Sequence, residues 1–155
     1  MSWVYDDGGR KDAGRRASRD CVVRAIAIAL ERPYMEVYEE LASLCKESRT
    51  KGGRSHPRRG ISTPVIRSYL AEAGWHWLPT IGIGTGCVVH LDPEELPGGT
   101  LIVSLSHHIC CVKDGVIHDT YNPARSGKRC VYGIWSKHIS SPYEFWLAQK
   151  MKKGA

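Results

Sequence analysis

Cys21 lies where the sequence predicts the start of a buried helix. Ser18 and Asp20 are good N-cap residues, and nearly every side chain in residues 22–30 is apolar, with Arg24 as the exception. At a helix start, unsatisfied backbone N–H groups and the positive end of the helix dipole favour a thiolate. The sequence therefore places a thiol where it could act as a nucleophile.

A β-hairpin is predicted around Asp114-Gly, a strong signal for a two-residue turn. Pairing of Lys113 with Val116 then fixes the register of the two strands. Because side chains alternate between the faces of a strand, His108 shares a face with Asp119 and lies diagonally across from it. We therefore expect Asp119 to be able to orient the His108 ring.

Asn122 is the alternative orienting residue. It lies almost opposite His108 but has the wrong parity, unless a bulge before Pro123 turns it inward. Either side chain could accept the imidazole N–H and fix its tautomer. A cysteine, a histidine and an Asp or Asn are the groups that form a thiolate–imidazolium nucleophile, so the sequence predicts a Cys–His–Asp/Asn catalytic triad.

The elements that must position these groups give an α+β domain with helices first and antiparallel strands after. We expect N-terminal helices, including a buried central helix, packed on a C-terminal antiparallel sheet, all in a single domain over residues 1–155. Residues 46–60 are basic and glycine-rich and are expected to form a flexible loop. Helices are expected over residues 21–32, 33–45, 63–73 and 143–150, and strands over 3–5, 75–79, 100–105, 107–113, 116–120 and 129–135.

The composition indicates an ordinary globular protein. The 155 residues are 42% hydrophobic and 25% charged, with a net charge of +6. No apolar run is long enough to cross a membrane, and the N-terminus lacks the basic-then-apolar pattern of a signal peptide. A cytoplasmic location is therefore expected, and reduced thiols are the default for the six cysteines.

The order of these features resembles the papain-like cysteine peptidase superfamily: a cysteine on a buried helix, a histidine opening a strand, and Asp/Asn-Pro after a hairpin. The pattern is closest to small members, namely bacteriocin-leader peptidases, cell-wall amidopeptidases and transglutaminase-like proteins. Several segments also resemble short proteins encoded by tailed bacteriophages, for which the host cytoplasm would be the location. These segments are Arg19-Asp-Cys-Val-Val-Arg-Ala-Ile-Ala-Ile-Ala, Gly82-Ile-Gly-Thr-Gly-Cys, Val116-Ile-His-Asp-Thr-Tyr-Asn-Pro with the preceding strand from His108, and Arg129-Cys-Val-Tyr-Gly.

The superfamily resemblance implies a papain-like fold and a thiol hydrolase or acyltransferase of the peptidase or amidase type. Cys21 would be the nucleophile and His108 the general base and acid, while Asn122 matches the family's residue before proline. The substrate would be a peptide or amide, and no cofactor is implied. Many members take an oxyanion donor from a glutamine just upstream of the cysteine, which residues 10–20 lack. The backbone N–H of Cys21, with Ser18 or Arg19, is expected to replace it.

Asp20 and a glycine-rich turn also bear on the predicted site. A carboxylate at Asp20 would raise the pKa of Cys21 unless it serves as the helix cap. The glycine-rich turn that begins at Gly82 is expected to pass close to the active-site cleft, since it lacks the lysine and Ser/Thr of a phosphate-binding loop.

Two other functions compete with catalysis. Cys87 and His90 have metal-ligand spacing, but the chain has no Cys-x-x-Cys pair, so a zinc site is disfavoured. Cys45, Cys110, Cys111 and Cys130 are expected in the core. A non-catalytic interaction module on the same scaffold is the stronger alternative. It would bind an acidic protein or nucleic acid through the basic loop and the arginine-rich segment 10–24. The cations of the loop are Lys46, Arg49, Lys51, Arg54, Arg58 and Arg59. No aromatic residue interleaves with these charges, so base stacking is not supported.

Overall fold

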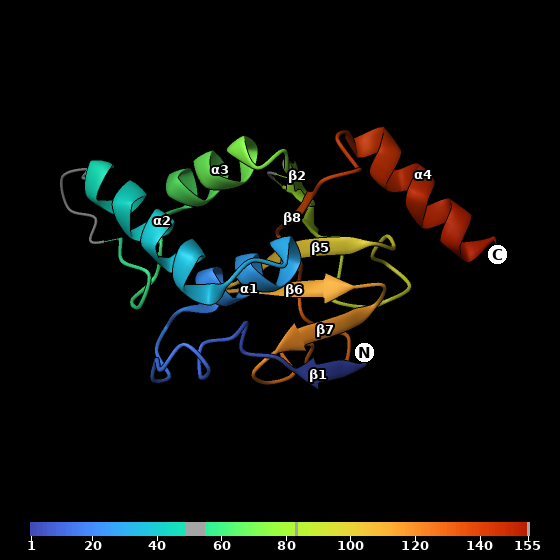
Figure 1. The fold of residues 1–155 in the computed structure, drawn as a ribbon. Helices are drawn as coiled ribbons and strands as arrows, with labels where there is room; N and C mark the ends of the chain where they lie inside the picture. The colour runs from blue at the N-terminus through green and yellow to red at the C-terminus, as the bar shows by residue number, and fades with distance from the viewer. Residues whose placement is uncertain (49–54, 83, 155) are drawn as a thin grey trace.

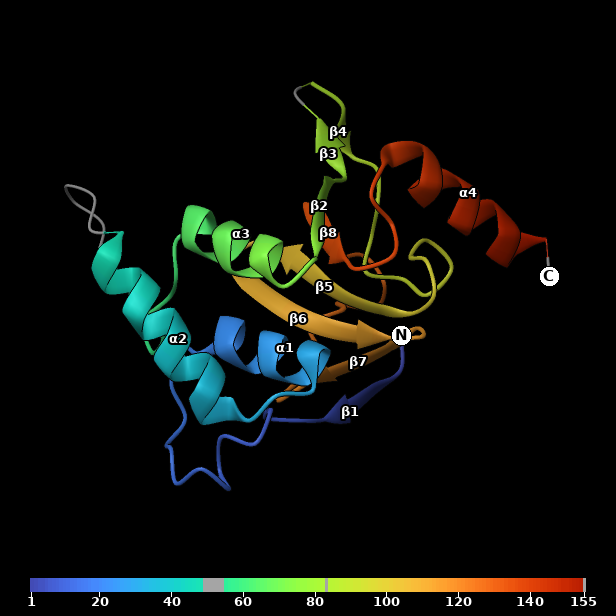
Figure 2. The same cartoon turned by 45° about the horizontal axis from the view of Figure 1, so that its top comes forward.

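A computed structural model describes residues 1–48, 55–82 and 84–154 of the chain. Within these residues, three helices pack against a six-stranded mixed sheet and a fourth lies apart from them (Figure 1). A separate two-stranded hairpin projects from the molecule (Figure 2). The expected α+β class is therefore confirmed.

The main sheet has the strand order β1-β7-β6-β5-β8-β2. The strands are β1 (Trp3–Tyr5), β2 (His76–Pro79), β3 (Ile81–Gly82), β4 (Gly86–Cys87), β5 (Thr100–Leu105), β6 (His108–Lys113), β7 (Val116–Asp119) and β8 (Gly133–Ser136). In the main sheet, β2, β5, β6, β7 and β8 form antiparallel pairs, as expected for the C-terminal half. The N-terminal strand β1 adds a parallel edge beside β7, so the sheet is not made from the C-terminal half alone.

The helices are α1 (Cys21–Leu30), α2 (Tyr34–Glu47), α3 (Thr63–Glu72) and α4 (Pro142–Lys153). Helix α1 lies over the sheet between α2 and the central strands, and every residue from its second to its ninth position is buried (Figure 2). This burial explains why the helix is apolar on nearly all sides. None of the helices in the described residues has the length and apolar character of a membrane span.

Two hydrophobic clusters cover the two faces of the sheet. The first packs α1, α2 and α3 against the sheet and includes Ile26, Leu41, Leu70 and Ile102. The second lies on the other face, where Leu91 and Leu96 from the segment before β5 belong to the same buried cluster as Val103 and Val112. Because both faces are covered, β5 and β6 are buried almost throughout, which accounts for their nearly continuous apolar sequence.

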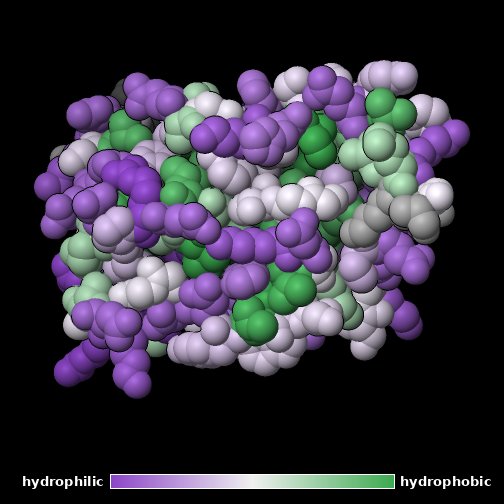
Figure 3. All heavy atoms as spheres, turned by 45° about the vertical axis from the view of Figure 1, so that its right-hand side comes forward, coloured by the Kyte–Doolittle hydropathy of each residue, from purple (hydrophilic) through white to green (hydrophobic). Residues whose placement is uncertain are grey.

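Helix α4 lies apart from the other helices (Figures 1 and 2). Its N-cap Ser141 accepts a hydrogen bond from the Glu144 N–H, and the Gln149 side-chain amide donates to the carbonyl of Glu95. Several large apolar side chains of the helix, Tyr143, Trp146, Leu147 and Met151, are exposed. On this side of the molecule, apolar side chains form separate groups among polar ones (Figure 3).

A disulfide joins Cys87 to Cys130, so the expectation of reduced thiols is wrong for this pair. Backbone hydrogen bonds between residues 89–91 and 129–131 hold the two segments together: the Val131 N–H donates to the Val89 carbonyl, and the Leu91 N–H donates to the Arg129 carbonyl. The two cysteines are 43 residues apart in sequence, with Cα atoms 5.8 Å apart. Only the tertiary pairing shows that they meet.

Candidate functional site

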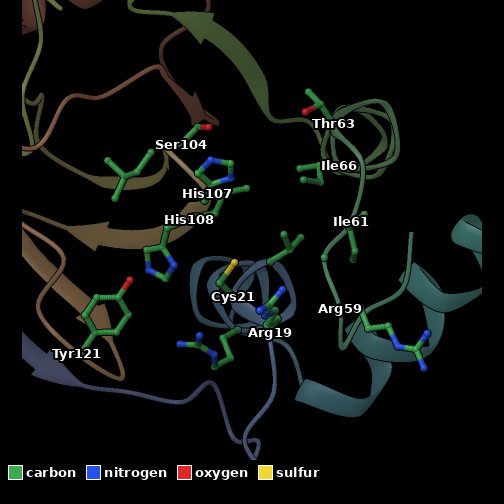
Figure 4. A pocket seen from close by; sticks show the side chains of 15 residues that line it. Arg19, Cys21, Arg59, Ile61, Thr63, Ile66, Ser104, His107, His108 and Tyr121 are labelled. Atoms are coloured by element: carbon green, nitrogen blue, oxygen red, sulfur yellow. The ribbon is translucent and has the colours of Figure 1, made fainter. Parts of the chain in front are cut away.

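The β6–β7 hairpin has the register that the sequence predicts. Lys113 pairs with Val116, and the next two pairs toward the far end are Val112 with Ile117 and Cys111 with His118. Since His108 begins β6 and Asp119 ends β7, both side chains lie at the end of the hairpin away from its turn. Helix α1 begins at this same end (Figure 4).

His108 and Asp119 form a buried hydrogen bond, with 2.6 Å between His108 Nε2 and Asp119 Oδ2. The backbone N–H of Thr120 donates to the other carboxylate oxygen at 2.7 Å. Burial raises the pKa of Asp119, but the bond and the charge from His108 outweigh it and hold the pKa below its ordinary value. Asp119 is therefore an ionised acceptor, and Nδ1 is the His108 nitrogen left free to exchange a proton with another group.

Cys21 lies beside the His108 ring, at the start of α1 (Figure 4). Burial raises the pKa of the Cys21 thiol, whereas hydrogen bonding with His108 and the charge of that ring lower it. The backbone N–H of Ile109 and the charge of Arg24 act in the same direction, so the pKa of Cys21 falls below its ordinary value. The free cysteines Cys45 and Cys110 show the opposite, because burial raises the pKa of each.

The pKa of His108 moves in the complementary direction. Burial lowers it, but hydrogen bonds with Asp119 and with Cys21 raise it above its ordinary value. A lowered thiol pKa beside a raised imidazole pKa favours a thiolate–imidazolium pair over two neutral groups. The arrangement can therefore supply a sulfur nucleophile together with a proton donor.

Arg24 connects Asp119 to a second buried carboxylate. Its Nη1 donates to Asp119 Oδ1 at 2.7 Å and to the Thr120 hydroxyl at 3.2 Å, while its Nε donates to Asp20 Oδ1 at 3.0 Å. The two carboxylates are almost fully buried, as is the arginine. Arg24 thus holds Asp119 through Oδ1, the carboxylate oxygen that does not pair with His108.

Asp20 occupies the N-cap position of α1 but makes no side-chain cap hydrogen bond. Its carboxylate instead accepts from Arg10 Nη1 at 2.9 Å and from the Tyr34 hydroxyl at 2.6 Å, in addition to Arg24. The capping role expected from the sequence is therefore wrong. Two arginines and a tyrosine take up the charge that would otherwise oppose ionisation of Cys21.

Asn122 does not orient His108. Its side-chain oxygen accepts from the backbone N–H of Ala124 at 3.0 Å, and its amide donates to the Met1 carbonyl at 3.4 Å. The residue is exposed in the turn that follows β7. Of the two candidate orienting residues, Asp119 is therefore the one that contacts His108. Asn122 forms a local turn around Pro123, and no bulge turns it inward.

A cavity of about 820 Å³ opens onto the Cys21 thiol. Figure 4 shows His107, His108 and Tyr121 on one side of the sulfur and Ile61, Ile66 and Arg59 on the other. The Tyr121 ring centroid lies 5.1 Å from that of His108. The remaining lining residues are Arg19, Val22, Arg24, Gly60, Thr63, Ser104, Leu105 and Ile109.

The two residues proposed as oxyanion donors are placed differently. Arg19 lines the cavity, whereas Ser18 does not. The Ser18 hydroxyl oxygen is buried and has no hydrogen-bond partner among the described residues. The expectation for Ser18 is therefore wrong.

The absence of a side-chain cap on α1 leaves the N–H groups of its first turn without a side-chain acceptor.

The basic loop is only partly described. Arg49, Lys51 and Arg54 lie outside the described residues. Arg58 and Arg59 are exposed, in a turn closed by backbone hydrogen bonds between His56 and Gly60. Arg59 lines the cavity, so this end of the loop belongs to the candidate site.

The glycine-rich turn does not reach the site. Its described residues form the β3–β4 hairpin, and none of them lines the cavity. The cysteine that ends this hairpin, Cys87, is bonded to Cys130, while the His90 ring contacts the Glu95 carboxylate at 3.1 Å. Among the described residues, no group of three or more His, Cys, Asp or Glu side chains is placed to hold a metal ion.

Sequence reasoning missed the buried charges behind the site. In the sequence, Arg24 is only the exception in an apolar helix, and the pattern carries no expectation for Tyr34. A signal for Arg24 was present, because an aspartate and an arginine four residues apart face each other on a helix. Nothing in the sequence indicates that Arg10 or Tyr34 would join them.

Comparisons with family models, with curated proteins and with solved structures found no match to this chain. Its chemistry therefore has to be inferred from the geometry of the site.

Proposed function

We propose that the protein is a thiol hydrolase or acyltransferase of the peptidase or amidase type, with a papain-like arrangement of its site. Cys21 is the nucleophile, His108 the general base and acid, and Asp119 the residue that orients the His108 ring. The observation that carries the proposal is the buried chain of contacts from Asp119 through His108 to a thiol with a lowered pKa. A core cysteine without such partners would have a raised pKa, as Cys111 does on β6, the strand that begins with His108.

In the first step the Cys21 thiolate attacks the carbonyl carbon of an amide. A carbon–sulfur bond forms and the carbonyl electrons move onto oxygen. When the carbon–nitrogen bond breaks, the leaving nitrogen takes the proton from the His108 imidazolium, so an amine departs and a thioester stays on Cys21. Nδ1 of His108 carries this proton, because Nε2 is held by Asp119.

In the second step neutral His108 removes a proton from water, and the resulting oxygen attacks the thioester carbonyl. The carbon–sulfur bond then breaks, the acid departs, and the thiolate–imidazolium pair is restored. If an amine replaces water, the same step transfers the acyl group. The choice between hydrolysis and transfer depends on the acceptor that enters the cavity.

The oxyanion of both steps needs hydrogen-bond donors near Cys21. The N–H groups of the first turn of α1 have no side-chain cap, and the Arg19 side chain lines the same cavity. Together they take the part that a glutamine plays in the superfamily. Arg24 does not touch the reacting atoms. It is a positioning residue that holds Asp119 through a 2.7 Å ion pair.

The test uses p-nitrophenyl acetate, an activated acyl donor that requires no knowledge of the natural substrate. We expect release of p-nitrophenol with turnover, and mass spectrometry of the intact protein should find an acetyl group on Cys21. Cys21→Ser should abolish both signals. His108→Gln should slow turnover while a residual acetylation of Cys21 persists, because the thiol is still present.

Acetylation that stops after one equivalent in the wild type would show a reactive thiol without catalysis and would contradict the proposal. So would acetylation of Cys45 at a rate equal to that of Cys21, since Cys45 is buried and has no histidine partner. Lys128→Gln, an exposed change outside the cavity, serves as the matched control and should turn over like the wild type.

A further inference from the structure

Two arginines lie on one rim of the cavity, and neither has a carboxylate partner among the described residues. Arg19 precedes α1, and Arg59 lies in the turn after residue 55. The two segments touch, because the Arg19 N–H donates to the carbonyl of Arg58 at 3.1 Å. Both side chains are exposed, both residues line the cavity, and neither forms an ion pair with any described residue (Figure 4).

No described residue that lines the cavity is acidic. The third lining arginine, Arg24, is already neutralised by Asp20 and Asp119. The rim charges of Arg19 and Arg59 are therefore the uncompensated ones. They lie beside the thiol and leave an excess of positive charge where a substrate must enter.

We propose that the cavity selects an acidic peptide, in which a carboxylate side chain close to the scissile amide contacts Arg19 and Arg59. This inference rests on the proposed function and names its substrate class. Ile61 and Ile66 form an apolar wall on the same side, suited to the aliphatic part of a glutamate or of its neighbours. A guanidinium pairs with a carboxylate through two parallel hydrogen bonds, which gives orientation as well as attraction.

A peptide fits this site better than a nucleic acid. Thiol acyl chemistry acts on a carbonyl carbon, which a phosphodiester backbone does not offer. Base stacking needs a series of exposed aromatic rings, and Tyr121 is the single Phe, Tyr or Trp side chain among the described lining residues. The basic rim thus serves the thiol site and need not be a separate binding surface.

The test measures peptide binding to the Cys21→Ser protein by isothermal titration calorimetry, so that turnover does not interfere. The probes are acetyl-tetraglutamate amide, its tetraglutamine counterpart and a uridine tetranucleotide. We expect the glutamate peptide to bind most tightly. The double variant Arg19→Gln/Arg59→Gln should weaken that binding by about tenfold, and added salt should weaken it in the parent protein, because exposed charges are screened.

Two changes separate the rim from general positive charge. Lys128→Gln/Lys11→Gln removes the same net charge from exposed positions outside the cavity and should leave binding of the glutamate peptide unchanged. Arg19→Lys/Arg59→Lys keeps the charge but loses the paired donors, so it should bind at an intermediate level. Equal binding of the glutamate and glutamine peptides, or tighter binding of the tetranucleotide, would overturn the inference.

The inference and the proposed function fail in different measurements. If Cys21 in the wild type is not acylated by p-nitrophenyl acetate, the proposed function fails, whatever the peptides show. If Cys21 is acylated with turnover but the rim variant binds acetyl-tetraglutamate amide as tightly as the parent, the substrate class alone is wrong.

Discussion

Nε2 of His108 and Oδ2 of Asp119 lie 2.6 Å apart, although the two residues sit on different strands. The two-residue turn at Asp114-Gly produces this contact, because it sets the register that brings the start of β6 beside the end of β7. The same end of the hairpin meets the first residue of α1. A local turn signal thus places Asp119 against His108, the residue that lowers the pKa of the Cys21 thiol.

Removal of the Asp119 charge should weaken Cys21 as a nucleophile. In Asp119→Asn the imidazolium loses a charge-assisted hydrogen bond worth roughly 1.5–3 kcal/mol, so the thiolate form becomes less favoured and alkylation of Cys21 at neutral pH should slow by about tenfold. The measurement is the rate of iodoacetamide labelling, resolved by peptide mass spectrometry. Asn122→Ala is the control, because the hydrogen bonds of the Asn122 side chain to described residues go to the Met1 and Ala124 backbone and not to His108. An equal loss in this variant would contradict the assignment.

The rate of Cys21 alkylation should follow the ionisation of a thiol whose pKa is lowered. The rate should reach half its maximum below the ordinary thiol value of 9.0 and fall only as the pH drops through the lowered pKa. In His108→Gln, where the lowering interactions are lost, the profile should move to higher pH, and the two proteins should converge once both thiols are ionised. Coincident profiles at all pH values would show that His108 does not act on the thiol.

Arg24 should be essential to stability because it separates two buried carboxylates. Arg24→Gln leaves Asp20 and Asp119 without their shared cation and is expected to lower the free energy of unfolding by about 3–5 kcal/mol. Urea denaturation followed by circular dichroism measures this change. Arg16→Gln, at an exposed position outside the network, should change it by less than about 0.5 kcal/mol.

The coupling between these charges can be measured separately. Asp20→Asn/Arg24→Gln should lose less than the sum of the two single changes, because each single change already breaks the same ion pair. Additive losses would mean that Asp20 and Arg24 do not interact in solution.

The Cys87–Cys130 disulfide should be detectable by counting thiols. Protein unfolded without reductant should give four titratable thiols, one each from Cys21, Cys45, Cys110 and Cys111. Reduction should raise the count to six and lower the free energy of unfolding by roughly 2–4 kcal/mol. Cys87→Ser/Cys130→Ser should be insensitive to reductant and should label at Cys21 like the wild type, since neither residue lines the cavity. A count of six thiols before reduction would show that the disulfide is absent and would contradict the prediction.

The sequence alone determined the features that depend on neighbouring residues. The start of α1 at Cys21 followed from the apolar run and from Asp20, which lies at the N-cap position although its side chain makes no cap hydrogen bond. The register of the β6–β7 hairpin followed from its turn, and this register was enough to predict that Asp119 shares a face with His108. Helix and strand periodicity likewise gave the α+β class, because each period reflects which side chains are buried.

The tertiary structure decided everything that depends on distant segments. In the folded chain, His108 contacts Asp119 and not Asn122. Arg10 and Tyr34 bind the Asp20 carboxylate, and Cys87 forms a disulfide with Cys130. The tertiary structure also brought Arg59 to the rim that Arg19 occupies. Each of these depends on how separate elements pack, and buried charges find partners wherever packing brings a counter-charge within reach, whatever the distance in sequence.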